Sequence, residues 1–199
     1  MQAEGYDLLN DIEKRIVKTA IELFQKHGYN DTSINEICSV CGVTKGTFYY
    51  HFNGKSDIIF RYYELLFQDV LSIMAELLVI HDTRQKLWKI YEYSIDNTVK
   101  LTAPLLKAMI LADMENGSGY FSALRCSKAS ESHLVQLQLI RKLVVQGQEE
   151  GVIRSDKDAD LLITTYNAIL MGMALDWSSS HGKYNQKEYL KKMFDIIFS

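Results

Sequence analysis

Residues 37–56 bring together the side chains of this chain that could contact nucleic acid. The stretch holds Lys45 and Lys55 and no acidic residue. Hydroxyl and imidazole groups surround these lysines at Thr44, Thr47, Tyr49, Tyr50 and His51. Groups of these kinds donate hydrogen bonds to phosphate oxygens and to base edges. Gly46 adds no side chain, so a helix that begins here can approach a duplex closely. The chemistry that this stretch predicts is binding of double-stranded DNA.

Two short helices would position these side chains. Ser33 precedes Glu36 by three residues, which is the capping-box spacing and predicts a helix over residues 34–40. Gly42 then turns the chain, and Thr44 can cap the next short helix. A helix, a glycine turn and a second helix form the helix-turn-helix arrangement, in which the second helix enters the major groove. We therefore add Ser33 to the candidate DNA-binding residues.

This part of the chain resembles the TetR (tetracycline-repressor-like) family of transcriptional regulators. The match is carried by TSINEICSVCGVTKGTFYYHFNGKSDII, residues 32–59, in which GVTKGTFYYHF is close to the family's usual pattern at every position. The preceding AIELFQKHGYNDTSINEI is similar as well, so the resemblance covers about the first 60 residues. Cys41 stands where the family commonly has alanine, which changes packing but not DNA contact.

The resemblance implies a subunit of about nine helices, a homodimer, and release from DNA when a small ligand binds. It also implies which positions meet DNA: Thr44, Lys45, Thr47, Tyr49, Tyr50, His51 and Lys55. Other interpretations of single residues stay open. Tyr50 could be a core aromatic residue, and His51 could cap the C-terminal end of its helix. Helix-turn-helix geometry also occurs in helical proteins that never touch DNA.

Two further patterns predict no metal site. Cys38 and Cys41 form a C-x-x-C motif, but zinc or redox chemistry needs a second ligand pair or a βαβ context. We expect these cysteines to be small core residues. The acidic residues 156, 158 and 160 resemble the start of a calcium loop, but the glycine and glutamate that such a loop needs are missing. We expect a solvated helix start there.

Composition predicts an all-α fold. The 199 residues contain one proline, whereas all-β folds use many Gly and Pro turns. Helical periodicity predicts helices over 8–27, 34–40, 44–50, 55–80, 82–100, 103–116, 130–150, 158–179 and 186–198, with an irregular stretch at 117–129. We expect a helix-turn-helix domain over residues 1–55 and a helical ligand-binding and dimerisation domain over residues 56–199.

Charge and hydropathy limit the classes of protein that fit. The net charge of −3 excludes a generally basic nucleic-acid coat, so DNA binding must come from a local patch. The longest uncharged run, residues 161–175, is shorter than the roughly 20 residues of a membrane span. The charged N-terminus does not read as a signal peptide, and three cysteines do not read as a disulfide framework. We expect a cytoplasmic protein that does not enter membranes.

The last two helices predict a homodimer. Both are apolar on all sides, and one subunit has few helices left to cover them. A twofold partner would cover them, although a larger single-chain core remains the alternative. The residues expected in the interface are Leu162, Ile169, Gly172, Met173, Trp177, Leu190, Met193, Phe194 and Ile197.

The middle helices could enclose an effector molecule. The candidate lining residues combine apolar walls with a few polar groups: Trp88, Tyr91, Met109, Tyr166, Asn167 and Met171. Residues of these types are more often plain core. The mechanism expected is a shift of helix 103–116 and of the irregular stretch after it, which helix 55–80 transmits to the DNA-binding helices.

The sequence therefore predicts a ligand-responsive transcriptional regulator, and a repressor before an activator. It would bind a near-palindromic DNA operator as a homodimer and leave it when a small molecule binds. We expect no enzymatic activity, cofactor or metal, because no positioned acid/base pair or metal-ligand set is visible. An enzyme on a helical scaffold and a helical partner-binding module remain the alternatives.

Overall fold

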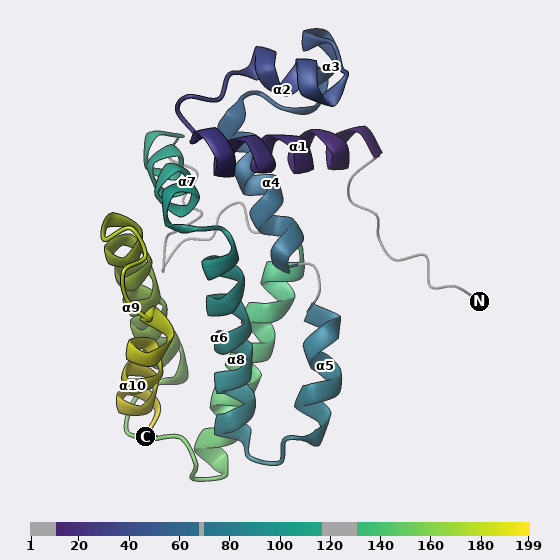
Figure 1. Cartoon of the computed structure of the whole chain (residues 1–199). Coiled ribbons are helices and arrows are strands. Elements are labelled where there is room, and N and C mark those ends of the chain that lie inside the picture. Colours follow the sequence, from purple (N-terminus) through teal and green to yellow (C-terminus); the bar gives the residue numbers. More distant parts are fainter. Residues whose placement is uncertain (1–10, 68–69, 117–130) are drawn as a thin grey trace, which may run out of the picture. The chain divides into compact units, whose positions relative to one another are not determined.

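A computed structural model of the chain describes residues 11–67, 70–116 and 131–199 (Figure 1). Within these ranges all regular structure is helical, which confirms the predicted all-α class. The ten helices described are α1 (Asp11–His27), α2 (Ile34–Cys41), α3 (Lys45–His51), α4 (Lys55–Phe67), α5 (Val70–Val79), α6 (Thr83–Lys100), α7 (Ala103–Asn116), α8 (Glu131–Glu149), α9 (Ala159–Ser179) and α10 (Gln186–Phe198). Backbone contacts group the chain into two compact units, Met1–Tyr62 and Tyr63–Ser199.

The helix expected over residues 55–80 differs in the structure. Two helices, α4 and α5, occupy this range on either side of residues 68–69. Those two residues lie outside the described part of the chain, as does the stretch 117–129 that was expected to be irregular.

The first unit is built on the apolar stripe of α1. Ile16, Ala20 and Phe24, which recur at steps of four residues, are buried there. α1 packs against α2, and α2 packs against α3. Phe48 and Phe52 are both buried, with ring centroids 5.8 Å apart, and so share this small core. The short helices α2 and α3 are thereby fixed by apolar contacts on one side and left free on the other.

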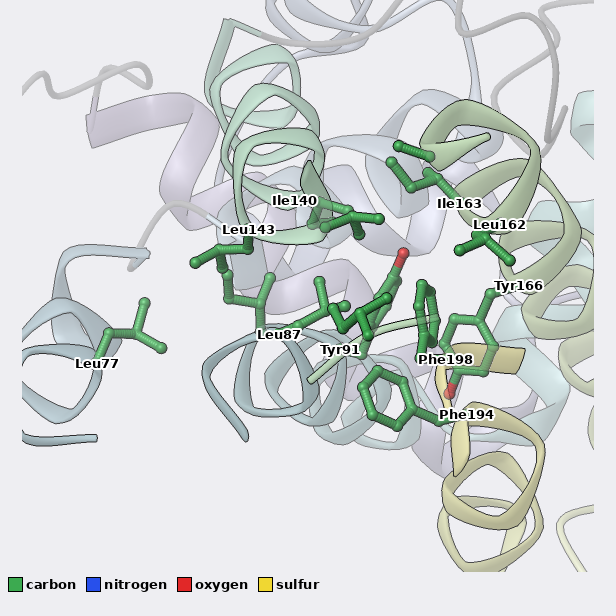
Figure 2. Packing of buried hydrophobic residues seen from close by; sticks show 14 of the residues in the cluster. Leu77, Leu87, Tyr91, Ile140, Leu143, Leu162, Ile163, Tyr166, Phe194 and Phe198 are labelled. Carbon is green, nitrogen blue, oxygen red and sulfur yellow. The ribbon is translucent and has the colours of Figure 1, made fainter. Parts of the chain in front are cut away.

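The second unit is a helical bundle. α6 packs against α5, α8 and α10, and α9 packs against α7, α8 and α10. An apolar cluster fills the space between α5, α6, α8, α9 and α10 (Figure 2). Its centre is aromatic: the ring centroids of Tyr91 and Tyr166 are 4.6 Å apart, and those of Phe194 and Phe198 are 4.7 Å apart. Edge-on and tilted ring packing of this kind joins α6, α9 and α10 into one core.

Side-chain caps begin two of the helices in this unit. The Asp82 carboxylate accepts a hydrogen bond from the Gln85 backbone N–H at 2.7 Å, and so caps α6. The Asp158 carboxylate accepts from the backbone N–H groups of Asp160 and Leu161 and caps α9. The acidic stretch that superficially resembled a calcium loop is therefore a helix start, as predicted.

Ion pairs join α6 to α10 at the surface. The Lys187 ammonium lies 2.9 Å from a carboxylate oxygen of Glu92 and 3.0 Å from one of Asp96. The Lys89 ammonium also lies 3.4 Å from Glu92. Burial raises the pKa of Glu92, but the hydrogen bonds from Lys187 and Lys89 outweigh this effect and hold that pKa below its usual value.

α4 is hydrogen-bonded near each of its ends. The Lys55 ammonium, in its first turn, donates to the backbone carbonyls of Tyr29 at 2.6 Å and Thr32 at 2.8 Å. In its last turn, the Leu66 carbonyl accepts from the Asn97 side-chain amide at 2.7 Å and from the Tyr93 hydroxyl at 3.2 Å. The beginning of α4 is thus held by the loop between α1 and α2, and its end is held by α6.

Candidate nucleic-acid interface

The turn between α2 and α3 is fixed by hydrogen bonds that the sequence specifies. The Ser33 hydroxyl accepts from the Glu36 backbone N–H at 3.1 Å and caps α2. Gly42 ends α2 with φ +69, a left-handed conformation that favours glycine. The Thr44 hydroxyl then accepts from the Thr47 backbone N–H at 3.0 Å and caps α3. These three residues set the helix-turn-helix geometry.

α3 presents its polar side to solvent. Phe48 is fully buried and anchors the helix, whereas Lys45 is exposed. Tyr49 is 56% exposed and Tyr50 is 84% exposed. The alternative that Tyr50 is a core aromatic residue is therefore wrong within this chain. We call Lys45, Tyr49 and Tyr50 the α3 surface.

Gly46 lies beside the α3 surface and leaves it open. A Cβ atom built at this position would meet only the Thr44 hydroxyl oxygen, at 3.7 Å, which is an ordinary contact. The fold therefore does not need a glycine here.

The two hydroxyls near the start of α3 bond to each other. The Thr44 and Thr47 oxygens are 2.8 Å apart, and both residues are at least partly exposed. A hydroxyl can donate and accept at the same time, so this pair keeps capacity for an outside partner. Ser33 is also exposed, at the start of α2. Three of the residues expected to contact DNA, Ser33, Thr44 and Thr47, thus also cap or stabilise their own helices.

His51 turns away from solvent. Its side chain is only 7% exposed, and its Nδ1 atom lies 3.2 Å from a Glu13 carboxylate oxygen. The contact ties the last turn of α3 to α1. This geometry makes His51 a residue that positions α3, so we leave it out of the proposed DNA contacts.

Lys55 also has an internal role. Its ammonium donates to the carbonyls of Tyr29, Asn30 and Thr32, which uses the three donors of a lysine. It also lies 4.6 Å from the centre of the Tyr29 ring. Burial lowers the pKa of Lys55 below its usual value. The family resemblance implied that Lys55 contacts DNA, whereas in the structure main-chain oxygens accept the hydrogen bonds of its ammonium.

The C-x-x-C motif belongs to the core of the first unit. Cys38 and Cys41 are both buried and free, which confirms their expected role as small core residues. Burial raises the pKa of the Cys38 thiol, and a protonated thiol is a poor nucleophile and metal ligand. Over the described residues, no group of three or more His, Cys, Asp or Glu side chains is placed to hold a metal ion.

The expected effector residues divide into two groups. Tyr91 and Tyr166 lie inside the apolar cluster of the second unit, and Trp88 packs against it with its ring centroid 5.3 Å from that of Phe194. Met109 is buried outside this cluster. Asn167 and Met171 are half-buried on α9, also outside it. The structure therefore brings three of the six candidates together.

The expected dimer residues need revision. The side chains of Leu162, Trp177, Leu190 and Phe194 are buried within the chain itself. Side chains already covered by their own subunit cannot also cover a partner, so we remove these four from the proposed interface. Ile169, Met173 and Ile197 are half-buried, and Met193 and Gly172 are exposed.

A set of exposed apolar residues on the same two helices was missed. It consists of Leu161 and Leu175 on α9 and of Tyr189 and Ile196 on α10. Leu161, Ala168, Gly172 and Leu175 recur at steps of seven, four and three residues, which places them on one face of α9. We call Leu161, Gly172, Leu175, Tyr189, Met193 and Ile196 the α9–α10 face. The helical spacing of these residues can be seen in the sequence. Apolar residues at the neighbouring positions of α9 made this face hard to distinguish from the other faces of the helix.

No helix in the described ranges is long and apolar enough to cross a bilayer.

Comparisons with known proteins agree with the geometry of the first unit. Residues 16–62 match the family model described as bacterial regulatory proteins, tetR family. YerO of Bacillus subtilis (strain 168), an uncharacterized HTH-type transcriptional regulator, is 47% identical over 51 residues, which is 26% of this chain and 18% of that protein. YuxN of the same organism, another such regulator, is 38% identical over 34% of this chain and 25% of that protein. The matches thus span a quarter or less of the length of these two relatives.

Other relatives match nearly the whole chain at lower identity. The probable acrEF/envCD operon repressor of Escherichia coli (strain K12) is 22% identical over 92% of this chain and 84% of that protein. Thermus thermophilus FadR, a TetR-family transcriptional repressor solved in complex with lauroyl-CoA, has a TM-score of 0.62 and 19% identity, and the match covers 93% of this chain and 92% of that one. The fatty acid degradation regulator FadR from Bacillus halodurans has a TM-score of 0.57 and 21% identity, with 95% of each chain covered. The resemblance is thereby confirmed: this chain carries the N-terminal helix-turn-helix region of the TetR family and has the all-helical fold of TetR-family regulators.

Proposed function

We propose that this protein is a transcriptional repressor that binds a near-palindromic DNA operator as a homodimer and leaves it when a small molecule binds. The observation that carries the proposal is the α3 surface. Lys45, Tyr49 and Tyr50 are exposed together on the second helix of a capped helix-turn-helix, in a stretch without acidic residues. A cation and two phenol hydroxyls suit phosphate oxygens and base edges.

Dimerisation compensates for the few phosphate-binding cations that each copy presents. The chain has a net charge of −3, so a single α3 surface offers few phosphate contacts. Two copies related by a twofold axis would double these contacts. They would read half-sites about 34–36 Å apart, or at a multiple of that spacing.

The α9–α10 face supports the homodimer. Its members are apolar or small and exposed, and they lie on two helices that pack against each other. A Cβ atom at Gly172 would meet nothing within 4 Å, so the glycine leaves room for a close neighbour. A twofold pairing of this face with itself would cover all of these residues.

Effector release is supported by the likeness to FadR of T. thermophilus, which was solved with lauroyl-CoA. A ligand shifts a regulator only if it binds one conformation better than the other. We propose that binding in the second unit moves α6 and α7, and that α4 carries the change to the DNA-binding helices. The hydrogen bonds of Asn97 to Leu66 and of Lys55 to the α1–α2 loop give α4 firm connections at both ends.

Footprinting on the DNA flanking the gene tests the proposal. We expect the protein to protect a near-palindromic site, and Lys45→Ala to weaken binding about tenfold or more. Because a dimer loses two phosphate contacts, the slope of log affinity against log salt should fall by about 2.

Lys142→Ala is the matched control, because Lys142 is an exposed lysine on α8 and its loss changes the net charge equally. We expect this variant to bind the site like the wild type. Equal weakening by both variants would show that only net charge matters, and would contradict the α3 surface as the DNA-binding surface.

A further inference from the structure

The Tyr91 hydroxyl is a buried polar group that the described part of the chain does not satisfy. Tyr91 lies on α6 with 2% of its surface exposed, and its hydroxyl oxygen has no hydrogen-bond partner there. Buried polar groups in folded proteins are nearly always hydrogen-bonded, because an unpaired one costs free energy. The position of this hydroxyl therefore points to a missing acceptor.

A neighbouring tyrosine shows the contrast. The Tyr166 ring lies edge-on to the Tyr91 ring in the same cluster, with centroids 4.6 Å apart. The Tyr166 hydroxyl donates to the Leu190 carbonyl at 2.9 Å and is satisfied inside the chain. The described part of the chain thus supplies an acceptor to the Tyr166 phenol and none to the Tyr91 phenol.

One other buried side-chain atom without a partner is described, the Nε of Arg84. That guanidinium is already held by Asp195, at 2.9 Å, and the Arg84 side chain is partly exposed. Tyr91 has neither an ion pair nor access to solvent. Its hydroxyl is therefore the stronger indication of a ligand.

The surroundings of the hydroxyl define the chemistry of its partner. In Figure 2 the Tyr91 oxygen points toward Ile140 on α8 and toward Leu162 and Ile163 on α9, away from Phe194. A buried water needs about three hydrogen bonds, and the aliphatic side chains of Ile140, Leu162 and Ile163, toward which the Tyr91 oxygen points, supply none. An apolar molecule with its own acceptor fits this environment better than a water.

The acceptor is best supplied by an uncharged carbonyl oxygen. A carboxylate would be buried against the aliphatic side chains of Ile140, Leu162 and Ile163, which is costly. An alcohol would bring a proton that again needs an acceptor, whereas a carbonyl brings acceptors alone. Burial raises the pKa of Tyr91 above its usual value, so its phenol keeps the proton that it would donate.

We propose that the second unit binds an uncharged, largely apolar molecule bearing a carbonyl oxygen, and that Tyr91 donates its hydroxyl hydrogen bond to that oxygen. The proposal rests on the proposed function in that it names the chemistry of the effector. The ligand would contact the helix whose Asn97 and Tyr93 side chains hold the Leu66 carbonyl at the end of α4. Tyr91 is thus a ligand-contacting residue on the helix that connects to α4.

Calorimetry on the full chain without DNA tests the inference, with 2-nonanone, nonane and nonanoate as probes. We expect the wild type to bind 2-nonanone at least fivefold more tightly than nonane, and more tightly than nonanoate. Tyr91→Phe should lower affinity for 2-nonanone about five- to tenfold and leave affinity for nonane unchanged. It should not lower the melting temperature, because it removes an unsatisfied hydroxyl.

Tyr166→Phe is the matched control, since it deletes a hydroxyl from the same cluster that the chain itself satisfies. It should lower the melting temperature by a few degrees and keep the preference for the ketone. The inference is overturned if the wild type does not bind 2-nonanone or binds it no better than nonane. Unchanged ketone affinity in Tyr91→Phe, or tighter binding of nonanoate, would also overturn it.

Footprinting distinguishes failure of this ligand inference from failure of the proposed function. If 2-nonanone binds with the expected dependence on Tyr91 and no operator is protected, the ligand site stands and DNA regulation is refuted. If the operator is protected and the ketone does not bind, the proposed DNA binding stands and the ligand inference is refuted.

Discussion

Gly46 is a residue that the fold tolerates rather than requires. It lies in the first turn of α3, where a Cβ would make one ordinary contact with Thr44. Glycine in a helix is less favourable than alanine by about 1 kcal/mol or less, because it loses more backbone entropy on folding. Despite this cost in stability, a glycine suits a helix that must come close to the backbone of another molecule.

We therefore expect Gly46→Ala to separate stability from DNA binding. Urea unfolding should show a free energy of unfolding that is unchanged or higher by up to about 1 kcal/mol. Operator affinity, measured by titration of labelled DNA, should fall at least tenfold because the new methyl group meets the duplex. A variant that binds as well as the wild type would place Gly46 outside the contact.

The two lysines near α3 show what residue type alone can predict. Lys45 and Lys55 stand in the same acid-free stretch, and the sequence treats them alike. The structure exposes Lys45 and turns the Lys55 ammonium onto carbonyls of residues 29, 30 and 32. Every residue has a carbonyl, so no side-chain pattern shows where a loop will converge on a cation.

At the scale of helices, the Thr44 hydroxyl caps and stabilises the start of α3. Thr44→Ala removes the acceptor of the Thr47 backbone N–H and should lower the free energy of unfolding by about 1 kcal/mol. Thr44→Ser keeps the hydroxyl and should restore most of this loss. Chemical denaturation of the full chain measures both. Equal stability of the wild type and the alanine variant would show that α3 does not depend on its cap.

Helix starts were the most predictable elements because their cause is local. Ser33, Thr44, Asp82 and Asp158 each accept a hydrogen bond from a backbone N–H two or three residues later, so the signal lies within one turn of sequence. The single helix expected over 55–80 is different. Apolar residues continue through this range, and periodicity alone gave no reason to divide it into α4 and α5.

The ion pairs between α6 and α10 predict a pH dependence. The pKa of Glu92 is held below its usual value of 4.5, so its contribution is present above about pH 4.5 and is lost as the pH falls through the lower folded value. Glu92→Gln should cost about 1 kcal/mol or less at pH 7, because the pair is partly solvated. As the pH falls below the lowered folded pKa of Glu92, the two proteins should converge in stability.

Thermal unfolding across pH 3–8 measures this difference. Glu149→Gln is the control, because Glu149 is an exposed glutamate near the end of α8. A gap between wild type and Glu92→Gln that stays constant down to pH 3 would assign the effect to packing and not to charge.

At the scale of the whole molecule, the α9–α10 face predicts the oligomeric state. Leu175→Lys and Ile196→Lys place a charge on side chains that are exposed in one chain and would be covered in a dimer. Each variant should sediment as a monomer and bind operator DNA at least a hundredfold more weakly, since one copy reads a single half-site.

Leu78→Lys is the matched control, because Leu78 is an exposed leucine on α5, away from this face. It should sediment like the wild type. Dimers that survive both Leu175→Lys and Ile196→Lys would show that another surface joins the copies.

The sides of α9 differ in burial in a way that its sequence alone does not show. The periodicity of α9 revealed a helix that is apolar on all sides, but not which side its own chain covers. Leu161 and Leu162 are adjacent and chemically identical, yet Leu162 is buried and Leu161 is 54% exposed. That difference depends on the neighbours of α9 in space, which are α7, α8 and α10.

In the hydrogen bonds at the two ends of α4, the acceptor residues tolerate substitution better than the donor residues do. Their acceptors are main-chain carbonyls, as at Asn30 and Leu66, and any amino acid at those positions supplies the same oxygen. Their donors are the side chains of Lys55 and Asn97, for which few residues could substitute. Descendants of this protein could therefore diverge widely along the α1–α2 loop and at the end of α4 and still keep these hydrogen bonds, provided that the two donors persist.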